Sequence, residues 1–434
     1  MNNLPANAEP HPAARPGDKA LWWVLAYVAL LPLPGPAEVV LAAGAIFACV
    51  RLLQLRRQGG IAPLLSAEAW GLTCLLFLAY WLPQLLAAVD ALDPGKAVGK
   101  AFSALRYLPF MWLVAIAVAT APRRRRLFTG LAVLALVWSL DALLQALLGS
   151  SPLFWSLDQL RTAVTGSPLC PPSEVQAVGR FNGVFSECNP KLGQVLAVLS
   201  PFLLLLAGKR RLLWCALALL CGLAVLLAGA RAAWLSYGLV LLLSGHAVLG
   251  RRAVLALAAA GVAAVLLAAV LVPSVGERLQ ATAGLFSGQA QATDNALAGR
   301  GRIWSGAMCM VAGHPLNGVG VRGFRHAWDA CDPAPQQPAA WGEGPALHAH
   351  QLVLEILAET GVLGLLCWLA GAALAIRAWR FAPAPARQRA LPAAIAIAVA
   401  VFPFNTHLAV YSAFWGGITL MLAALYVGAL QARD

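Results

Sequence analysis

The sequence predicts an all-α, polytopic membrane protein with about twelve transmembrane helices and a large loop on the outer side of the membrane. Hydrophobic residues make up 60% of the 434 residues and charged residues only 11%, a balance that no soluble domain of this length needs. The apolar residues form long continuous runs, which is typical of membrane helices. The net charge is +13, and most of the basic residues lie in short clusters between the apolar runs. Such clusters set the orientation of membrane proteins, so the positive charge does not predict a nucleic-acid partner.

Apolar runs of about 17 to 25 residues can cross a bilayer as helices. Residues 1–20 precede the first run and are interpreted as a cytoplasmic tail, because they contain no short apolar segment with a cleavage site. Pro32, Pro34 and Pro36 interrupt the first run, which favours a tight helical hairpin with the second. The predicted spans are residues 21–34, 36–55, 69–89, 103–121, 127–149, 191–208, 212–229, 232–249, 253–273, 351–377, 390–405 and 408–429.

These spans divide the chain into regions. Residues 21–273 hold the first nine spans, with an outer loop at residues 150–190. Residues 274–350 form the large outer loop, in which we expect short helices. Residues 351–434 hold the last three spans and a cytoplasmic C-terminus.

The orientation follows from five basic clusters, each of which comes after an even-numbered span. Basic loops stay on the cytoplasmic side of a membrane, so all five clusters and both termini are expected there. The clusters are Arg51, Arg56 and Arg57; Arg123–Arg126; Lys209–Arg211; Arg251–Arg252; and Arg377, Arg380, Arg387 and Arg389.

The outer side nevertheless carries many cations, which loops on that side normally avoid. An anionic ligand at the outer leaflet is a physical reason for them. The plainer alternative is that long loops are exported regardless of charge; it suits Arg161 and Arg278 and is open for Arg325. The full set is Arg161, Arg180, Lys191, Arg231, Arg278, Arg300, Arg302, Arg322 and Arg325.

The large loop contains three recognisable segments. Residues 302–312 predict a short amphipathic helix at the membrane interface or over a cavity, ended by residues 313–315. Residues 316–324 predict a sharp glycine-rich turn, which permits close backbone approach and is weak evidence for phosphate binding. Residues 332–338 are rich in proline and predict a mobile or extended linker. The apolar face of the short helix would be Ile303, Trp304, Ala307, Met308 and Val311.

The candidate chemistry rests on arginine and histidine. Acidic residues of the outer loops are isolated, so no divalent metal site and no cofactor is expected, and arginine would bind phosphate oxygens instead. Arg231 opens a span at the outer side, where the alternative is a snorkelling side chain; Arg180 has the same two interpretations. The isolated acidic residues are Glu174, Glu187, Asp294, Asp329, Asp332 and Glu343.

His350 lies at the start of the tenth predicted span. An imidazole can accept a proton from a sugar hydroxyl, although a lone histidine more often only caps a helix. His348 would face another direction on a helix, and His314 and His326 are interpreted as structural. Four cysteines lie in or near the outer loops, where a disulfide is possible but its connectivity is open: Cys170, Cys188, Cys309 and Cys331.

Together these motifs resemble the O-antigen ligase and O-antigen polymerase superfamily over roughly residues 180–365. The chain has Gln351 and Ala230 where members of that family usually have Asn and Ser. The motifs that carry the resemblance are Arg180-x-x-Gly183, Gly229-Ala230-Arg231, Arg302 with Trp304, His314-Pro-Leu-x-Gly-Val-Gly320 and His350-Gln-x-x-Leu354-x-x-Leu357-x-Glu359-x-Gly361.

The resemblance implies a GT-C-like, inverting, metal-independent glycosyltransferase of the bacterial inner membrane, with a large periplasmic loop. Its donor would be a glycan on undecaprenyl pyrophosphate and its acceptor the lipid A–core oligosaccharide. The resemblance assigns catalytic roles to His350 and Arg231 and leaves the choice between Arg300 and Arg302 open. Residues expected to bind the pyrophosphate are Arg180, Arg231, Arg300, Arg302 and Arg322.

Two alternatives remain at this point. The polymerase and protein-glycosylating branches of the same superfamily would use the same residues on a different acceptor. A secondary transporter would also be polytopic, but such proteins often contain inverted repeats, and the sequence has no evident internal repeat.

Overall fold

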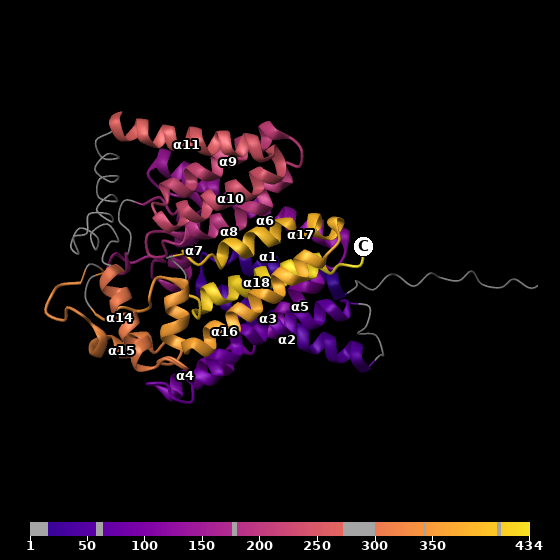
Figure 1. The fold of residues 1–434 in the computed structure, drawn as a ribbon. Helices are drawn as coiled ribbons and strands as arrows, with labels where there is room; N and C mark the ends of the chain where they lie inside the picture. Colours follow the sequence, from indigo (N-terminus) through magenta and orange to yellow (C-terminus); the bar gives the residue numbers. More distant parts are fainter. Residues whose placement is uncertain are drawn as a thin grey trace, which may run out of the picture.

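The computed structural model describes residues 16–57, 64–175, 180–271, 300–339, 341, 344–405 and 409–434, and all regular structure within these ranges is helical (Figure 1). The ribbon is a bundle of long helices with a small group of short helices at one end. The described part of the chain therefore has the all-α architecture that the long apolar runs predict.

The amino-terminal helices confirm the predicted hairpin. The first helix ends at Ala29 and the second begins at Pro34, so Pro32 falls in the turn and Pro34 occupies a first helical position, where its missing N–H costs nothing. The helices of this half are α1 (Pro16–Ala29), α2 (Pro34–Arg57), α3 (Ala67–Ala87), α4 (Pro94–Ala104), α5 (Tyr107–Val118) and α6 (Ala121–Leu148).

The remaining helices continue the bundle and add the short ones. The outer-loop helices are α7 (Pro152–Thr165), α14 (Arg300–Gly313) and α15 (Phe324–Cys331). The long ones are α8 (Leu192–Leu206), α9 (Arg211–Leu227), α10 (Arg231–Leu249), α11 (Arg251–Leu271), α16 (Leu352–Phe381), α17 (Ala384–Ala400) and α18 (Ala413–Leu430).

Each predicted span overlaps a helix of the structure. Among the described residues, seven helices are long and apolar enough to cross a membrane, one of them the α4–α5 unit Pro94–Val118. Three shorter apolar helices, Lys19–Ala29, Leu192–Leu206 and Arg211–Leu227, accompany them. The chain is thus a multi-pass membrane protein, and the total of twelve crossings stays a prediction.

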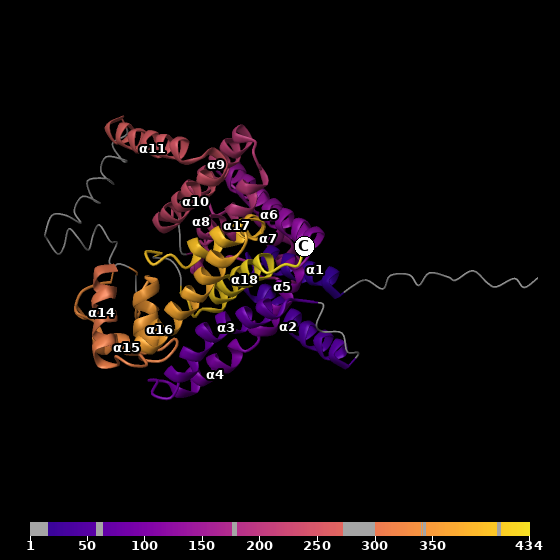
Figure 2. The ribbon, with the colours of Figure 1, turned by 45° about the vertical axis from the view of Figure 1, so that its right-hand side comes forward.

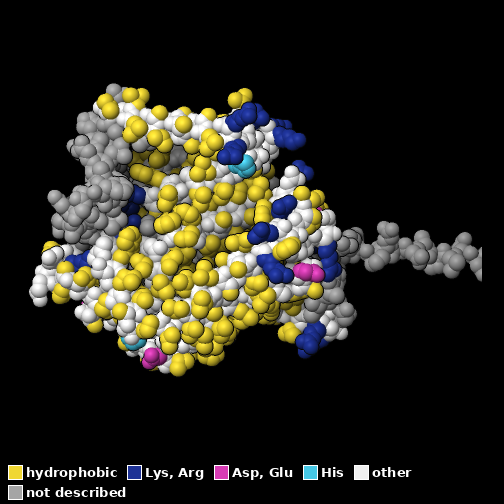
Figure 3. Space-filling view, viewed as in Figure 1, with side chains coloured by type: hydrophobic (Ala, Val, Ile, Leu, Met, Phe, Trp, Pro, Cys, Tyr) yellow, Lys and Arg dark blue, Asp and Glu magenta, His cyan; other side chains and the backbone are white. Residues whose placement is uncertain are grey.

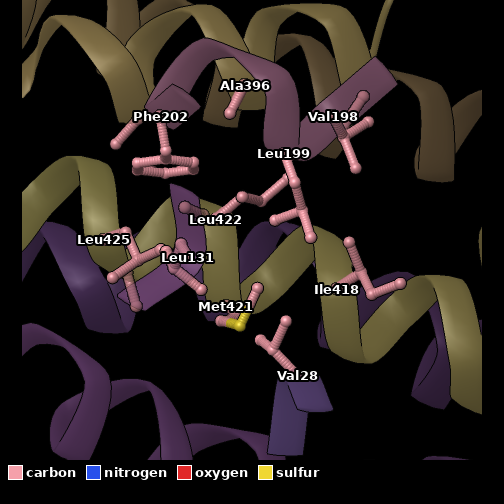
Figure 4. Close-up of a cluster of buried hydrophobic side chains, with 14 of the residues drawn as sticks. Val28, Leu131, Val198, Leu199, Phe202, Ala396, Ile418, Met421, Leu422 and Leu425 are labelled. Atoms are coloured by element: carbon pink, nitrogen blue, oxygen red, sulfur yellow. The ribbon is translucent and has the colours of Figure 1, made fainter. Parts of the chain in front are cut away.

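The core of the bundle is built around α18, which lies in the middle of the bundle in both ribbon views (Figures 1 and 2). It is buried from Trp415 to Leu430. Figure 4 shows Val28, Leu131, Phe202, Ala396 and Met421 converging from α1, α6, α8, α17 and α18. Such interdigitated packing fixes the helices relative to one another. The bundle is therefore a rigid frame for the loops at its ends.

The two ends of the bundle differ in chemistry. Lys and Arg side chains gather at the end that carries the C-terminus, beside a broad hydrophobic band (Figure 3). At that end Arg124 pairs with Asp434 at 2.6 Å, and Arg389 donates to the carbonyl oxygens of Ala429 and Ala432. The short helices α14 and α15 lie at the opposite end (Figures 1 and 2). This polarity agrees with the orientation that the basic clusters predict.

Candidate functional site

A break in α16 organises the end of the bundle that carries α14 and α15. Gly361 has φ 65° and ψ −167°, which interrupts the helix between two long segments, and only glycine adopts that conformation readily. Four backbone hydrogen bonds join the break to the segment before α15: Val319 to Ala358 and Gly320 to Glu359, and Val362 to Pro315 and Leu363 to Leu316. The glycine-rich turn is therefore docked on the broken helix.

Close approach explains the glycines of this turn. A Cβ on Gly318 would lie 2.4 Å from the backbone of Glu359, and one on Gly361 would lie 2.2 Å from the carbonyl oxygen of Leu316. Neither position tolerates a side chain. Of the two interpretations of the turn, backbone approach fits the structure. The apolar run at residues 351–377 predicts a continuous span, and the break at Gly361 corrects this prediction.

The short helix α14 (Arg300–Gly313) covers this region. It ends at Gly313, as predicted, and the Nε1 of Trp304 donates to the carbonyl oxygen of Ala349 at 3.1 Å. The predicted apolar face was wrong in one position, because Met308 is 54% exposed. The buried face consists instead of Ile303, Ala307 and Met310, at the i, i+4, i+7 spacing of one helical face.

Two disulfides brace the outer loops. Cys170 is bonded to Cys188, and Cys309 of α14 is bonded to Cys331 of α15. The four cysteines are those that the sequence places in or near the outer loops, and the structure supplies the connectivity that spacing could not. The second bond ties the two short helices into one unit.

His350 lies immediately before the amino-terminal cap of α16, in the left-handed region at φ 51°. The cap is Gln351, whose side chain accepts a hydrogen bond from the backbone N–H of Leu354. The Nδ1 of His350 is buried and has no hydrogen-bond partner within the described residues, so this atom is available to a ligand.

His348 belongs to the same site, contrary to the expectation that it faces elsewhere. The rings of His348 and His350 lie 3.8 Å apart between centroids, and the Nδ1 of His348 accepts a hydrogen bond from the backbone N–H of His350 at 3.2 Å. The expectation assumed a helix at both residues, whereas the helix begins after them. The same Nδ1 lies 3.5 Å from the buried carboxyl group of Glu355, a neighbour that the sequence does not predict.

The electrostatic environment keeps both imidazoles neutral. Burial, then the neighbouring His348 and Arg300, lowers the pKa of His350 to about 3. Burial and the charges of Arg322, Arg325 and Arg300 lower the pKa of His348 to about 4. A neutral imidazole has a free ring nitrogen that accepts a proton. The pair is therefore in the base form at physiological pH.

Arg180 and Arg231 come together at the junction of α9 and α10, where α10 begins at Arg231. The backbone N–H of Phe181 donates to the carbonyl oxygen of Leu227 at 3.2 Å, and the side chain of Arg180 packs over Gly229. The Gln145 side chain of α6 accepts from the N–H of Gly183 at 2.7 Å. These contacts hold the first arginine motif against the second.

Arg300, at the first position of α14, joins this group. Burial and then the charge of Arg231 lower the pKa of the Arg300 guanidinium, and the charge of Arg300 in turn acts on His350. The three segments that carry Arg180, Arg231 and Arg300 are far apart in the sequence. Arg300 thus lies near both Arg231 and His350, and Arg180 packs over Gly229, two residues before Arg231. This is a suitable arrangement for holding a dianion close to a base.

Arg302 has a different environment. Its guanidinium lies 2.6 Å from Oδ2 of Asp332, donates to the carbonyl oxygen of Gln337 at 3.0 Å and stacks over Trp341. The same contact holds the pKa of Asp332 below its usual range. Residues 332–338 are thus tied down by Arg302, and their interpretation as a mobile or extended linker was wrong.

Arg322 and Arg325 are two further arginines near His348. Their charges act on His348 and on buried Glu359 of α16. The Nε and Nη2 atoms of Arg325 are buried without a partner among the described residues, which disfavours the solvated alternative that the sequence leaves open for Arg325. Arg161 is exposed on α7, as expected, and Arg278 lies outside the described residues.

Comparison with known protein families identifies the central part of the chain. Residues 216–369 match the family model described as O-antigen ligase. This segment contains Arg231, Arg300, Arg302, Arg322 and His350 but not Arg180. No curated protein matches the sequence.

Proposed function

We propose, from the premise that the chain carries the domain of the O-antigen ligase family over residues 216–369, that it is an inverting, metal-independent glycosyltransferase. It would move O-antigen polysaccharide from undecaprenyl pyrophosphate to the lipid A–core oligosaccharide. The single observation that carries this proposal is a neutral His350 near Arg300, which in turn lies near Arg231, because this pairs a base with a site for a diphosphate leaving group.

The arginines would bind the donor. A guanidinium stays charged at any relevant pH and can donate two parallel hydrogen bonds to phosphate oxygens. Arg180, Arg231 and Arg300 would hold the pyrophosphate and stabilise the negative charge that grows on it as the glycosidic bond breaks. Arg302 is proposed to keep α14 in place instead, because Asp332 already neutralises it.

His350 would act on the acceptor. Its neutral ring would take the proton of the acceptor hydroxyl, whose oxygen forms a bond to the anomeric carbon while the bond from that carbon to the phosphate oxygen breaks. The electron pair leaves with undecaprenyl pyrophosphate. A single displacement of this kind inverts the anomeric configuration, and it uses no paired carboxylates of the kind that retaining enzymes need.

The location of the reaction is proposed from orientation. Disulfides form in oxidising compartments, and both disulfides of the described chain lie in the loops expected on the outer side. The basic clusters lie at the other end, as expected for a cytoplasmic side. Both observations favour an active site that faces the periplasm, with both termini cytoplasmic.

The experiment is reconstitution of the purified protein in vesicles with an undecaprenyl-pyrophosphate-linked glycan. Three acceptors are offered separately: lipid A–core, a second copy of the carrier-linked glycan, and an unmodified periplasmic protein. The proposal expects glycan on lipid A–core alone. Product on the carrier glycan would assign the polymerase branch instead, and product on protein would assign the protein-glycosylating branch.

A further inference from the structure

A large apolar groove lies between α1 and α6, away from the candidate active site. Its volume is about 1200 Å³, and its walls are mostly the apolar side chains of Leu21, Trp22, Leu25, Val133 and Leu134. Gly130 forms part of the floor: a Cβ there would lie 2.6 Å from Leu25, so the glycine lets the two helices touch below the groove. The side chains of Trp22 and Val133 are 67% and 48% exposed, so the groove opens to the membrane-facing surface.

Two arginines stand at one end of this groove. Arg125 and Arg126 line it, are exposed and make no hydrogen bond or ion pair with any described residue. Their neighbours are engaged elsewhere: Arg123 donates to the Thr120 hydroxyl and Arg124 binds Asp434. Of the four consecutive arginines, Arg123 and Arg124 therefore bind other residues of the protein, whereas Arg125 and Arg126 lie beside the apolar groove.

The combination fits one kind of ligand. An apolar groove at the depth of the bilayer takes hydrocarbon chains, and two unpaired guanidinium groups at its cytoplasmic end take the phosphate of a lipid headgroup. The acyl chains of a zwitterionic lipid would also fit the groove, but its headgroup would place a positively charged ammonium group next to the two arginines. We propose that the α1–α6 groove is a binding site for an anionic glycerophospholipid of the cytoplasmic leaflet. This proposal is independent of glycosyl transfer.

The test is retention of lipid by the full-length protein. The detergent-purified protein is mixed with phosphatidylglycerol and phosphatidylcholine of identical acyl chains, and bound lipid is measured by native mass spectrometry. Arg125→Gln/Arg126→Gln is compared with Arg56→Gln/Arg57→Gln, which removes the same charge from the end of α2. Each basic residue near an anionic lipid contributes about a fivefold effect, so the first pair is expected to weaken phosphatidylglycerol binding about 30-fold and the second to leave it unchanged.

The apolar part of the site is tested by filling it. Val133→Trp is expected to abolish retention of phosphatidylglycerol, whereas Val137→Trp, one turn further along α6 and outside the groove, keeps it. Equal binding of the two lipids by the wild-type protein, or equal loss in both arginine pairs, would overturn the proposal. So would a cross-linked dimer through α1 and α6, because a second copy would then cover the groove.

Discussion

At the scale of single residues, the proposed role of His350 as a base depends on the charges around its imidazole. Burial, and then the neighbouring His348 and Arg300, lowers the pKa of His350 to about 3, and a base with so low a pKa is fully deprotonated at neutral pH. A dianionic donor bound as proposed would offset the charges of Arg231 and Arg300 and so raise the basicity of the imidazole. The proposed site would therefore gain a stronger base on binding its donor.

This arrangement predicts a particular pH profile. Protonation of His350 removes its acceptor nitrogen, so kcat/KM of the wild-type enzyme should stay level from pH 8 down to about pH 5 with respect to this group. Arg300→Gln removes a repulsive charge, so the pKa of His350 rises and the acid limb should move to higher pH, along with a fall in rate of about a hundredfold. Arg161→Gln is the control. An acid limb that stays in place in Arg300→Gln would contradict the placement of that arginine beside His350.

Arg302 is predicted to affect the stability of the protein and not the catalytic rate. Removing one partner of a charged hydrogen bond costs roughly 2 kcal/mol when both side chains are largely screened from water, and here they are 13% and 8% exposed. Arg302→Gln and Asp332→Asn should therefore each lower thermal stability, and the double variant should lose less than the sum. The KM for the lipid-linked donor should not change. A raised donor KM with unchanged stability would return Arg302 to the pyrophosphate site.

At the scale of elements, the site depends on two joints that hold separate segments together. Asp141 of α6 accepts hydrogen bonds from Ser151 and from the N–H of Leu153, which fixes the start of α7. The second joint is the docking of residues 315–320 on the broken α16. Arg322 and the helix start that carries His350 both depend on it.

The second joint can be tested through its glycine. Gly361→Ala would place a methyl group into the backbone of Leu316 at a conformation that only glycine adopts readily, at a cost of about 3 kcal/mol or more. We expect loss of both folded yield and transfer activity. Gly313→Ala meets nothing within 4 Å and should behave like the wild type. A stable and active Gly361→Ala protein would show that the break is dispensable.

Elements with long apolar runs could be predicted from the sequence, and the others could not. The hairpin at Pro32 and the end of α14 at Gly313 follow from local signals. The helix α7 was missed, because it buries no side chain completely. Short helices were expected in the large loop, but the position of α15 was not predicted, because it has only 8 residues. The break at Gly361 is hidden because its partners lie some forty residues earlier in the chain.

The candidate site was predictable in composition but not in arrangement. The sequence predicts which arginines and histidines are on the outer side, because that prediction needs only the spans and the basic clusters. It cannot choose between Arg300 and Arg302, because the choice depends on Asp332 and on Arg231, each far from it in sequence. The same limit applies to Glu355, whose burial beside His348 is set by tertiary packing.

At the scale of the whole molecule, the account requires one orientation in the membrane. Protein isolated from bacteria with an oxidising periplasm should contain the disulfides Cys170–Cys188 and Cys309–Cys331, and protein from cells that lack periplasmic disulfide oxidation should not. Replacing Cys309 and Cys331 by Ser should cost about 3 kcal/mol, as expected for loops of this length. Thiol labelling under reducing and non-reducing conditions measures the disulfide content of the protein from each strain. Fully reduced cysteines in both strains would contradict the proposed orientation.

The central claim is that His350 acts directly on the acceptor while the arginines hold the leaving group. The measurement that tests it most directly is transfer of glycan from undecaprenyl pyrophosphate to lipid A–core by reconstituted His350→Ala, compared with the wild type and with His326→Ala, whose histidine is exposed on α15. Loss of a general base lowers the rate by about a hundredfold to ten-thousandfold, so the transfer rate of His350→Ala should fall by about a hundredfold or more. Its donor binding should not change, and His326→Ala should transfer glycan at the wild-type rate. A correctly inserted His350→Ala protein that transfers glycan at the wild-type rate would contradict the account.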